Sequence, residues 1–131
     1  MTIDMAIDYL KKVEPYYIPN RTRLRDKKFF RAMSYGRTAI MLMRETLQNV
    51  LDATAPWDPY QPDPLSELEA LKMRIDHHAC NAHNEEASYM FSTMYDTITY
   101  LLDDLYFMEE QEYEDEDEPK ELVRRNYGKI K

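Results

Sequence analysis

Glycine is almost absent from this chain, at two of 131 residues. Turns between strands rely on glycine, so a sheet-rich fold is disfavoured. Phosphate-binding loops also need glycine, and none of the glycine motifs of nucleotide-binding proteins or of serine hydrolases occurs. Nine methionines are present instead, and methionine fills irregular helical cores. The composition therefore predicts an all-α protein.

Cysteine and long apolar runs are scarce as well. The single thiol, Cys80, cannot form an intramolecular disulfide, which favours a reducing compartment. The richest apolar run, TAIMLM, stops at Arg44, well short of the roughly 18 residues that span a bilayer. The first ten residues, MTIDMAIDYL, carry acids where a secretory signal carries basic residues. We therefore expect a cytoplasmic protein with no membrane association.

Apolar periodicity predicts a small bundle of about four main helices. Their expected bounds are 3–14, 27–54, 65–80 and 84–110. The second helix has a seam with 4-3-4-3 spacing, which is typical of a helix that packs on another helix and leaves room for a homodimer. Gly36 on this seam either permits a close helix approach or is a tolerated weak point. The seam consists of Phe29, Met33, Gly36, Ile40, Met43, Leu47 and Val50.

Capping residues and prolines mark the helix boundaries. Thr2, Asp63 and Asn84 each precede an expected helix and can accept a hydrogen bond from its first turn. Pro15 ends the first helix. Prolines recur every third residue in the linker 55–64, which favours a stiff spacer over a peptide ligand for an aromatic groove.

The charge of the chain is segregated, which the net charge of -8 hides. Residues 19–44 sum to +7 and residues 101–118 to -10, and the run EEQEYEDEDE over 109–118 holds eight carboxylates. In a helix this run would carry one charge per about 1.9 Å, close to the one per about 1.7 Å of duplex DNA. Because like charges at i,i+4 repel, the same density disfavours an isolated helix. We therefore predict a bundle over 1–110 and an acidic, partly disordered extension over 111–131, with a short helix at 120–127.

Three interpretations of this charge pattern remain open. The acidic segment pairs with the basic segment inside the fold, or it binds a basic partner, or the basic segment 21–44 binds nucleic acid and the acidic tail competes with it. The acidic candidates are Asp103, Asp104, Glu109, Glu110, Glu112, Tyr113, Glu114, Asp115, Glu116, Asp117 and Glu118. The basic candidates are Arg21, Arg23, Arg25, Lys27, Lys28 and Arg31.

Tyrosine is abundant, at eleven residues, and several tyrosines accompany the acids of the last long helix. Tyrosine is enriched at protein interfaces because it buries a large area and keeps a polar tip. Packing at the edge of the core is the alternative for each of them. The residues are Tyr89, Tyr95, Tyr100, Tyr106 and Tyr113.

One cluster of metal-ligating residue types occurs, and its best-placed members are Asp76, Cys80 and His83. On one helix they span about 10 Å, so a single ion could bind two of them but hardly three. A structural zinc site needs four converging ligands. Cys80 also lacks an orienting group that would make it a nucleophile. We therefore expect no metal, no other cofactor and no catalytic activity.

These features predict a non-catalytic acidic interaction protein that binds a basic surface of a macromolecular partner. The hypothesis is a nucleic-acid mimic that inhibits a nucleic-acid-handling complex. In size and charge the chain is similar to small acidic helical inhibitors made by bacteriophages, although no motif supports that similarity. The alternatives are a helical assembly factor or chaperone that holds a basic partner, and a nucleic-acid-binding protein with an autoinhibitory acidic tail.

Overall fold

The computed structural model describes residues 1–17 and 27–117, with side chains described for 1–17 and 28–112. The described residues form four α-helices and a short 3₁₀ helix, without a strand. None of these helices is apolar over a stretch long enough to cross a membrane. The predicted all-α bundle is therefore confirmed. The elements are α1 (Ile3–Val13), η1 (Glu14–Tyr17), α2 (Lys27–Ala53), α3 (Pro64–Cys80) and α4 (Glu85–Asp117).

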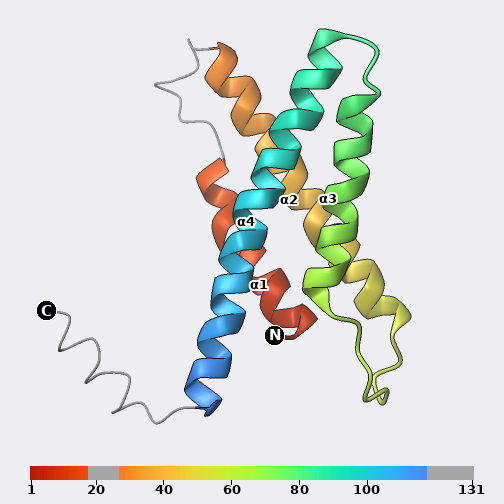
Figure 1. Cartoon of the computed structure of the whole chain (residues 1–131), viewed down its shortest axis with the longest axis vertical. Coiled ribbons are helices and arrows are strands. Elements are labelled where there is room, and N and C mark those ends of the chain that lie inside the picture. The colour runs from red at the N-terminus through yellow and green to blue at the C-terminus, as the bar shows by residue number, and fades with distance from the viewer. Residues whose placement is uncertain (18–26, 118–131) are drawn as a thin grey trace, which may run out of the picture.

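The helices lie side by side along the long axis of the molecule (Figure 1). α2 and α4 both start at the end shown at the top and run in the same direction, whereas α3 runs the opposite way. α4 packs on both α2 and α3, and α1 packs on α2. The C-terminal half of α4 therefore lies at the opposite end of the bundle from the start of α2.

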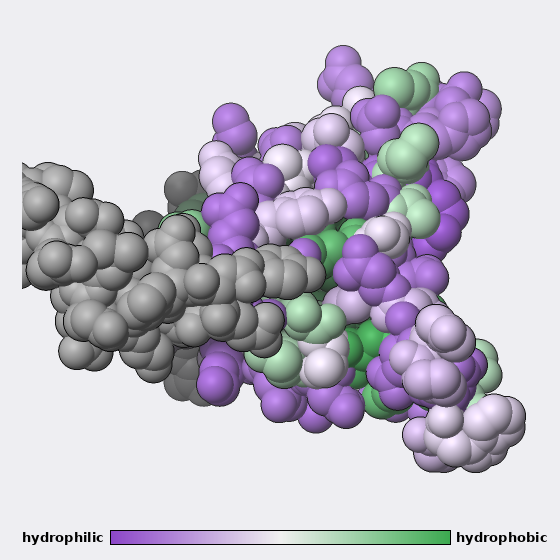
Figure 2. All heavy atoms as spheres, turned by 60° about the horizontal axis from the view of Figure 1, so that its bottom comes forward, coloured by the Kyte–Doolittle hydropathy of each residue, from purple (hydrophilic) through white to green (hydrophobic). Residues whose placement is uncertain are grey.

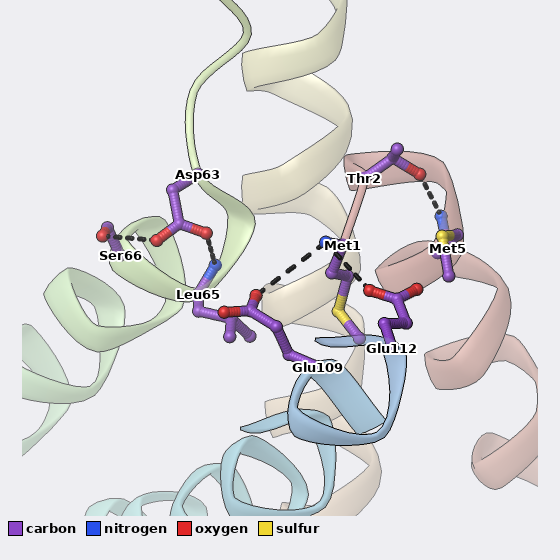
Figure 3. Close-up of polar contacts among 8 residues, drawn as sticks. All are labelled: Met1, Thr2, Met5, Asp63, Leu65, Ser66, Glu109 and Glu112. Atoms are coloured by element: carbon purple, nitrogen blue, oxygen red, sulfur yellow. Dashed lines mark hydrogen bonds and ion pairs between the residues drawn. The ribbon is translucent and has the colours of Figure 1, made fainter. Parts of the chain in front are cut away.

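The predicted capping residues begin three of the helices. The Thr2 hydroxyl accepts a hydrogen bond from the Met5 amide at 3.2 Å, and the Asn84 side chain accepts one from Ala87 at 2.7 Å. Asp63 accepts from the Leu65 amide at 3.2 Å and from the Ser66 hydroxyl at 2.9 Å (Figure 3). Each cap satisfies donors that the first helical turn cannot pair internally, and this is why the helices begin where the sequence indicates.

α4 extends beyond its expected end at residue 110 and continues to Asp117. Glutamate has a high intrinsic helix propensity, and each like-charge pair costs only a few tenths of a kcal/mol. Local propensity therefore outweighs repulsion over 111–117, the first part of the segment predicted as a partly disordered extension. Glu118 and the short helix predicted at 120–127 lie outside the described residues.

The core is one continuous apolar cluster to which all four helices contribute. The middle of the α2 seam is fully buried inside the chain, while Phe29, Met33 and Val50 at its ends are half-buried. Since α1, α3 and α4 cover this seam, it does not supply the homodimer face that its spacing suggested. The buried apolar residues are Ile3, Ala6, Ile7, Leu10, Ala39, Ile40, Met43, Leu47, Leu65, Leu68, Leu71, Ile75, Met94, Ile98, Leu101, Leu102 and Leu105.

Candidate functional site

All the charged side chains of α4 are acidic. Its 33 residues include 12 acids and no lysine or arginine. In Figure 2, which turns the lower end of the bundle toward the viewer, the coloured part of the surface is mostly hydrophilic, with hydrophobic residues in smaller areas near its middle. The acids of α4 divide into those that contact other parts of the chain and those that face solvent.

Three of the predicted partner-binding acids are engaged within the chain. The N-terminal ammonium of Met1 lies between Glu109 and Glu112, at 3.9 and 3.1 Å from their carboxylates (Figure 3). Asp104 accepts a hydrogen bond of 2.6 Å from the Tyr9 hydroxyl, which joins α1 to α4. These carboxylates therefore help to hold α1 and the N-terminus against α4.

Two other predicted acids, Asp103 and Glu110, are exposed and have no ion pair or hydrogen bond among the described side chains. Asp96 is equally exposed and free of described partners, although the sequence prediction did not include it. It lies seven residues before Asp103, and this spacing returns to the same helical face. For 113–117 the structure describes the helical backbone, so Tyr113, Glu114, Asp115, Glu116 and Asp117 are placed on α4 without their side chains.

Two large aromatic side chains lie between the free acids and point to solvent. Tyr100 is 72% exposed and Phe107 is 60% exposed. They are seven residues apart, so their positions are separated by about 10.5 Å along the helix. Tyr100 was a predicted interface residue, whereas Phe107 was missed; its spacing from Tyr100 was the available signal. We call the set Asp96, Tyr100, Asp103, Phe107 and Glu110 the outer α4 face.

The described start of the predicted basic segment lies at the other end of the bundle from the acidic half of α4. Arg31 near the start of α2 forms an ion pair of 2.9 Å with Glu86 near the start of α4. From Glu86 to Glu109 the helix rises about 35 Å, several times the Debye length of about 8 Å at physiological salt. Arg44 pairs with Glu14 at 3.0 Å, not with an acid of α4.

Among the described side chains, none of the basic residues of 28–44 therefore pairs with the acidic half of α4. Lys28 is exposed and has no described partner. Arg21, Arg23 and Arg25, and the side chain of Lys27, lie outside the described part of the chain.

Three tyrosines that donate hydrogen bonds to carboxylates have raised pKa values. Partial burial, followed by the hydrogen bond to Asp104, raises the pKa of Tyr9. The hydrogen bond to Glu86 is the main cause that raises the pKa of Tyr35. Burial, and then the charge of Glu69, raises the pKa of Tyr106. These tyrosines are neutral donors to carboxylates, so they fix acidic side chains without cancelling their charge.

The cluster of metal-ligating residue types is at the turn between α3 and α4. Asp76, Cys80 and His83 are all exposed. Within the described residues, no three His, Cys, Asp or Glu side chains converge in a metal-binding arrangement. His78 instead stacks on Phe91 with ring centroids 5.3 Å apart, a packing role that joins the end of α3 to α4.

Comparisons with protein-family models, with curated proteins and with solved structures give no match to this chain. The candidate site is accordingly defined by its residues. Carboxylates and aromatic rings on a helix can bind cations, basic side chains and apolar groups. The outer α4 face presents carboxylates and aromatic rings of these kinds to solvent.

Proposed function

We propose that this protein is a non-catalytic acidic interaction protein whose fourth helix binds a basic surface of a macromolecular partner. By occupying that surface it excludes nucleic acid from a nucleic-acid-handling complex. The observation that supports this proposal is the exposed, acidic outer α4 face, on a helix without basic residues; its members lie about 15 to 36 Å along α4 from Glu86, which pairs with Arg31. Carboxylates whose only role was to neutralise the chain's own basic residues would lie beside those residues.

The density of charge indicates which part of α4 resembles a nucleic acid. Between Asp96 and Glu110 the exposed carboxylates Asp96, Asp103, Asp104 and Glu110 amount to one per about 5 Å of helix. Duplex DNA carries one charge per about 1.7 Å, a value that only the run 109–118 approaches. Mimicry of a phosphate backbone therefore depends on the acidic run, while the earlier part of the face extends the contact area.

The experiment is capture of partners from lysate of the source cells by the intact chain and by a charge-neutralised variant. The variant leaves Glu109 and Glu112 in place, because both contact the N-terminus. It combines Glu110→Gln, Glu114→Gln, Asp115→Asn, Glu116→Gln and Asp117→Asn. A matched control removes five exposed charges elsewhere: Asp4→Asn, Asp8→Asn, Glu45→Gln, Asp52→Asn and Asp76→Asn.

We expect the neutralised variant to bind the captured partner at least about tenfold more weakly, since several charge contacts are lost, and the control to bind nearly as well as the intact chain. Affinity should fall steeply with salt, and a DNA or RNA oligonucleotide should compete for the partner. An unchanged partner list and affinity in the neutralised variant would refute the proposal. Binding without oligonucleotide competition would reject the decoy role and identify an assembly factor instead.

A further inference from the structure

The structure contains one arginine docked on α4, and its geometry shows how this helix binds a guanidinium group. The Arg31 side chain from α2 forms the ion pair with Glu86 and lies over the ring of Tyr89, 5.9 Å from the ring centroid. Glu86 and Tyr89 are three residues apart, so they lie on the same side of α4. One arginine thus contacts a carboxylate and an aromatic ring at once.

The same combination of acid and aromatic recurs along the outer α4 face. Its five members alternate acid and aromatic: Asp96, Tyr100, Asp103, Phe107, Glu110. Their spacing is 4-3-4-3, the spacing of a seam that packs along another helix. The members are exposed, and no described basic side chain covers them. The outer α4 face thus repeats the pairing of a carboxylate with an aromatic ring that Arg31 contacts near the start of the helix, and here no described side chain occupies it.

We propose that the outer α4 face binds an arginine-bearing helix of the partner, with each guanidinium seated between a carboxylate and the ring of Tyr100 or Phe107. This inference rests on the proposed function and names the feature of the partner that is recognised. Arginine fits because its planar group pairs with a carboxylate and stacks on an aromatic face at the same time. Lysine, a compact and strongly hydrated charge, gains less from the ring.

Charge complementarity favours a partner over the protein's own residues. The described side chains of Arg31 and Arg44 are paired with Glu86 and Glu14, and the described basic side chains without an ion pair, such as Lys28, Arg37 and Arg74, make no contact with the outer α4 face. A helix that lies on this face and carries positive charge would meet acids and aromatic rings, and no basic residue of α4 would repel it. The chain's own arginines outside the described residues are the competing occupants, and the test distinguishes them.

The test uses two fluorescein-labelled, alanine-based helical peptides of about three heptads. One carries arginine at the seam positions of each heptad, and the other carries lysine at the same positions. Binding to the full-length protein is measured by fluorescence anisotropy at low salt. The variants are Tyr100→Ala with Phe107→Ala and, for charge, Asp103→Asn with Glu110→Gln.

A matched aromatic control is Trp57→Ala with Tyr60→Ala, two residues of the linker that are 83% and 87% exposed. All these side chains are exposed, so folding should persist, and circular dichroism verifies it. For the intact protein we expect the arginine peptide to bind about fivefold or more tightly than the lysine peptide, given two exposed cation–π contacts. The Tyr100 and Phe107 double variant should abolish that ratio, and the linker control should keep it.

The outcomes separate this inference from the proposed function. If the charge variant weakens both peptides but the aromatic variant leaves the ratio unchanged, the arginine inference is refuted and the acidic interaction surface stands. If neither peptide binds, with the C-terminal arginines present or replaced, or if the charge variant has no effect, the arginine inference is refuted, and the partner capture described above decides the proposed function separately. Arginine-selective binding that appears only after Arg124→Gln and Arg125→Gln would assign the face to the chain's own C-terminal arginines and overturn the partner proposal.

Discussion

At the scale of single residues, three tyrosines hold carboxylate side chains in place by donating hydrogen bonds to them. Tyr9 donates to Asp104, Tyr35 to Glu86 and Tyr106 to Glu69, each time across two helices. A phenol satisfies a carboxylate by hydrogen bonding and leaves its negative charge intact. This gives three of the eleven tyrosines a physical role that composition alone did not reveal: they link α4 to the other helices and leave the charge of the carboxylates intact.

The hydrogen bond from Tyr9 to Asp104 gives a prediction about pH. The pKa of Tyr9 is raised in the folded chain, so the folded state holds the phenolic proton more tightly than the unfolded state. The contribution of this hydrogen bond to the free energy of unfolding is complete below the ordinary tyrosine pKa of about 10. It is lost as the pH rises from there through the pKa that Tyr9 has in the folded chain. We expect Tyr9→Phe to lower the free energy of unfolding by about 1 kcal/mol at pH 7.

Above pH 10 the difference between Tyr9→Phe and the intact protein should shrink. Urea unfolding followed at intervals from pH 7 to pH 11 measures it. Tyr16→Phe is the control, because this side chain is 79% exposed and has no described hydrogen bond. Parallel stability curves for Tyr9→Phe and the intact protein would show that the hydrogen bond carries no such contribution.

At the scale of elements, Gly36 lies where three of them meet. A Cβ atom at this position of α2 would lie 2.7 Å from Cδ2 of Tyr17 in η1 and 3.2 Å from the Thr97 hydroxyl oxygen of α4. Gly36 therefore permits the close approach of Tyr17 and Thr97 to α2, which is the first of the two explanations considered for this glycine from the sequence. η1 covers the same position, so its short turn of helix fits against α2 because no side chain intervenes.

This contact predicts coupling between Gly36 and Tyr17. Alanine would gain about 1 kcal/mol in helix propensity, but overpacking typically costs about 1–3 kcal/mol. We expect Gly36→Ala to destabilise the intact protein by about 1 kcal/mol and to be neutral or stabilising in a Tyr17→Ala background, where the ring no longer blocks the methyl group. A double-mutant cycle from urea unfolding measures the coupling. Additive effects would mean that the ring is not the obstacle.

At the scale of the whole molecule, the parallel course of α2 and α4 separates the charges. Both helices start at the same end, so the basic start of α2 lies beside Glu86, and the acidic half of α4 lies at the far end. The opposite direction for either helix would bring the two charged segments together. Among the described residues, this arrangement leaves the carboxylates of the outer α4 face exposed and without an ion pair.

This separation predicts the effect of salt on stability. With acids gathered on α4 and few described ion pairs, repulsion should dominate, and its screening should stabilise the fold. We expect the free energy of unfolding at pH 7 to rise by about 1 kcal/mol between low and high sodium chloride, as several like-charge pairs of a few tenths each are screened. Arg44→Gln, which removes one ion pair, should leave this slope positive.

Thermal unfolding by circular dichroism over a salt series measures the effect, and chloride is used because sulfate strengthens apolar burial by itself. A stability that falls with salt would mean that the acidic run is held on basic residues of the same chain. That result would favour the internal-pairing interpretation over an outward acidic surface.

Local signals account for the part of the fold that could be predicted. The apolar seam and the caps at Thr2, Asp63 and Asn84 depend on neighbours within a few residues, and the structure agrees with them. The end of α4 was misjudged because propensity and repulsion are close in size over 111–117. Phe107 was missed because an apolar residue on a helix resembles core until its neighbours are known.

By itself the sequence determined the helical class, the helix starts and the acidity of the last long helix, since periodicity, capping and charge are properties of short segments. Only the tertiary structure decided which acids face solvent, that Glu109 and Glu112 meet the N-terminus, and that the charged ends lie apart. Those facts depend on the direction and rotation of each helix in the bundle. Packing of the shared core sets both, and no single segment encodes them.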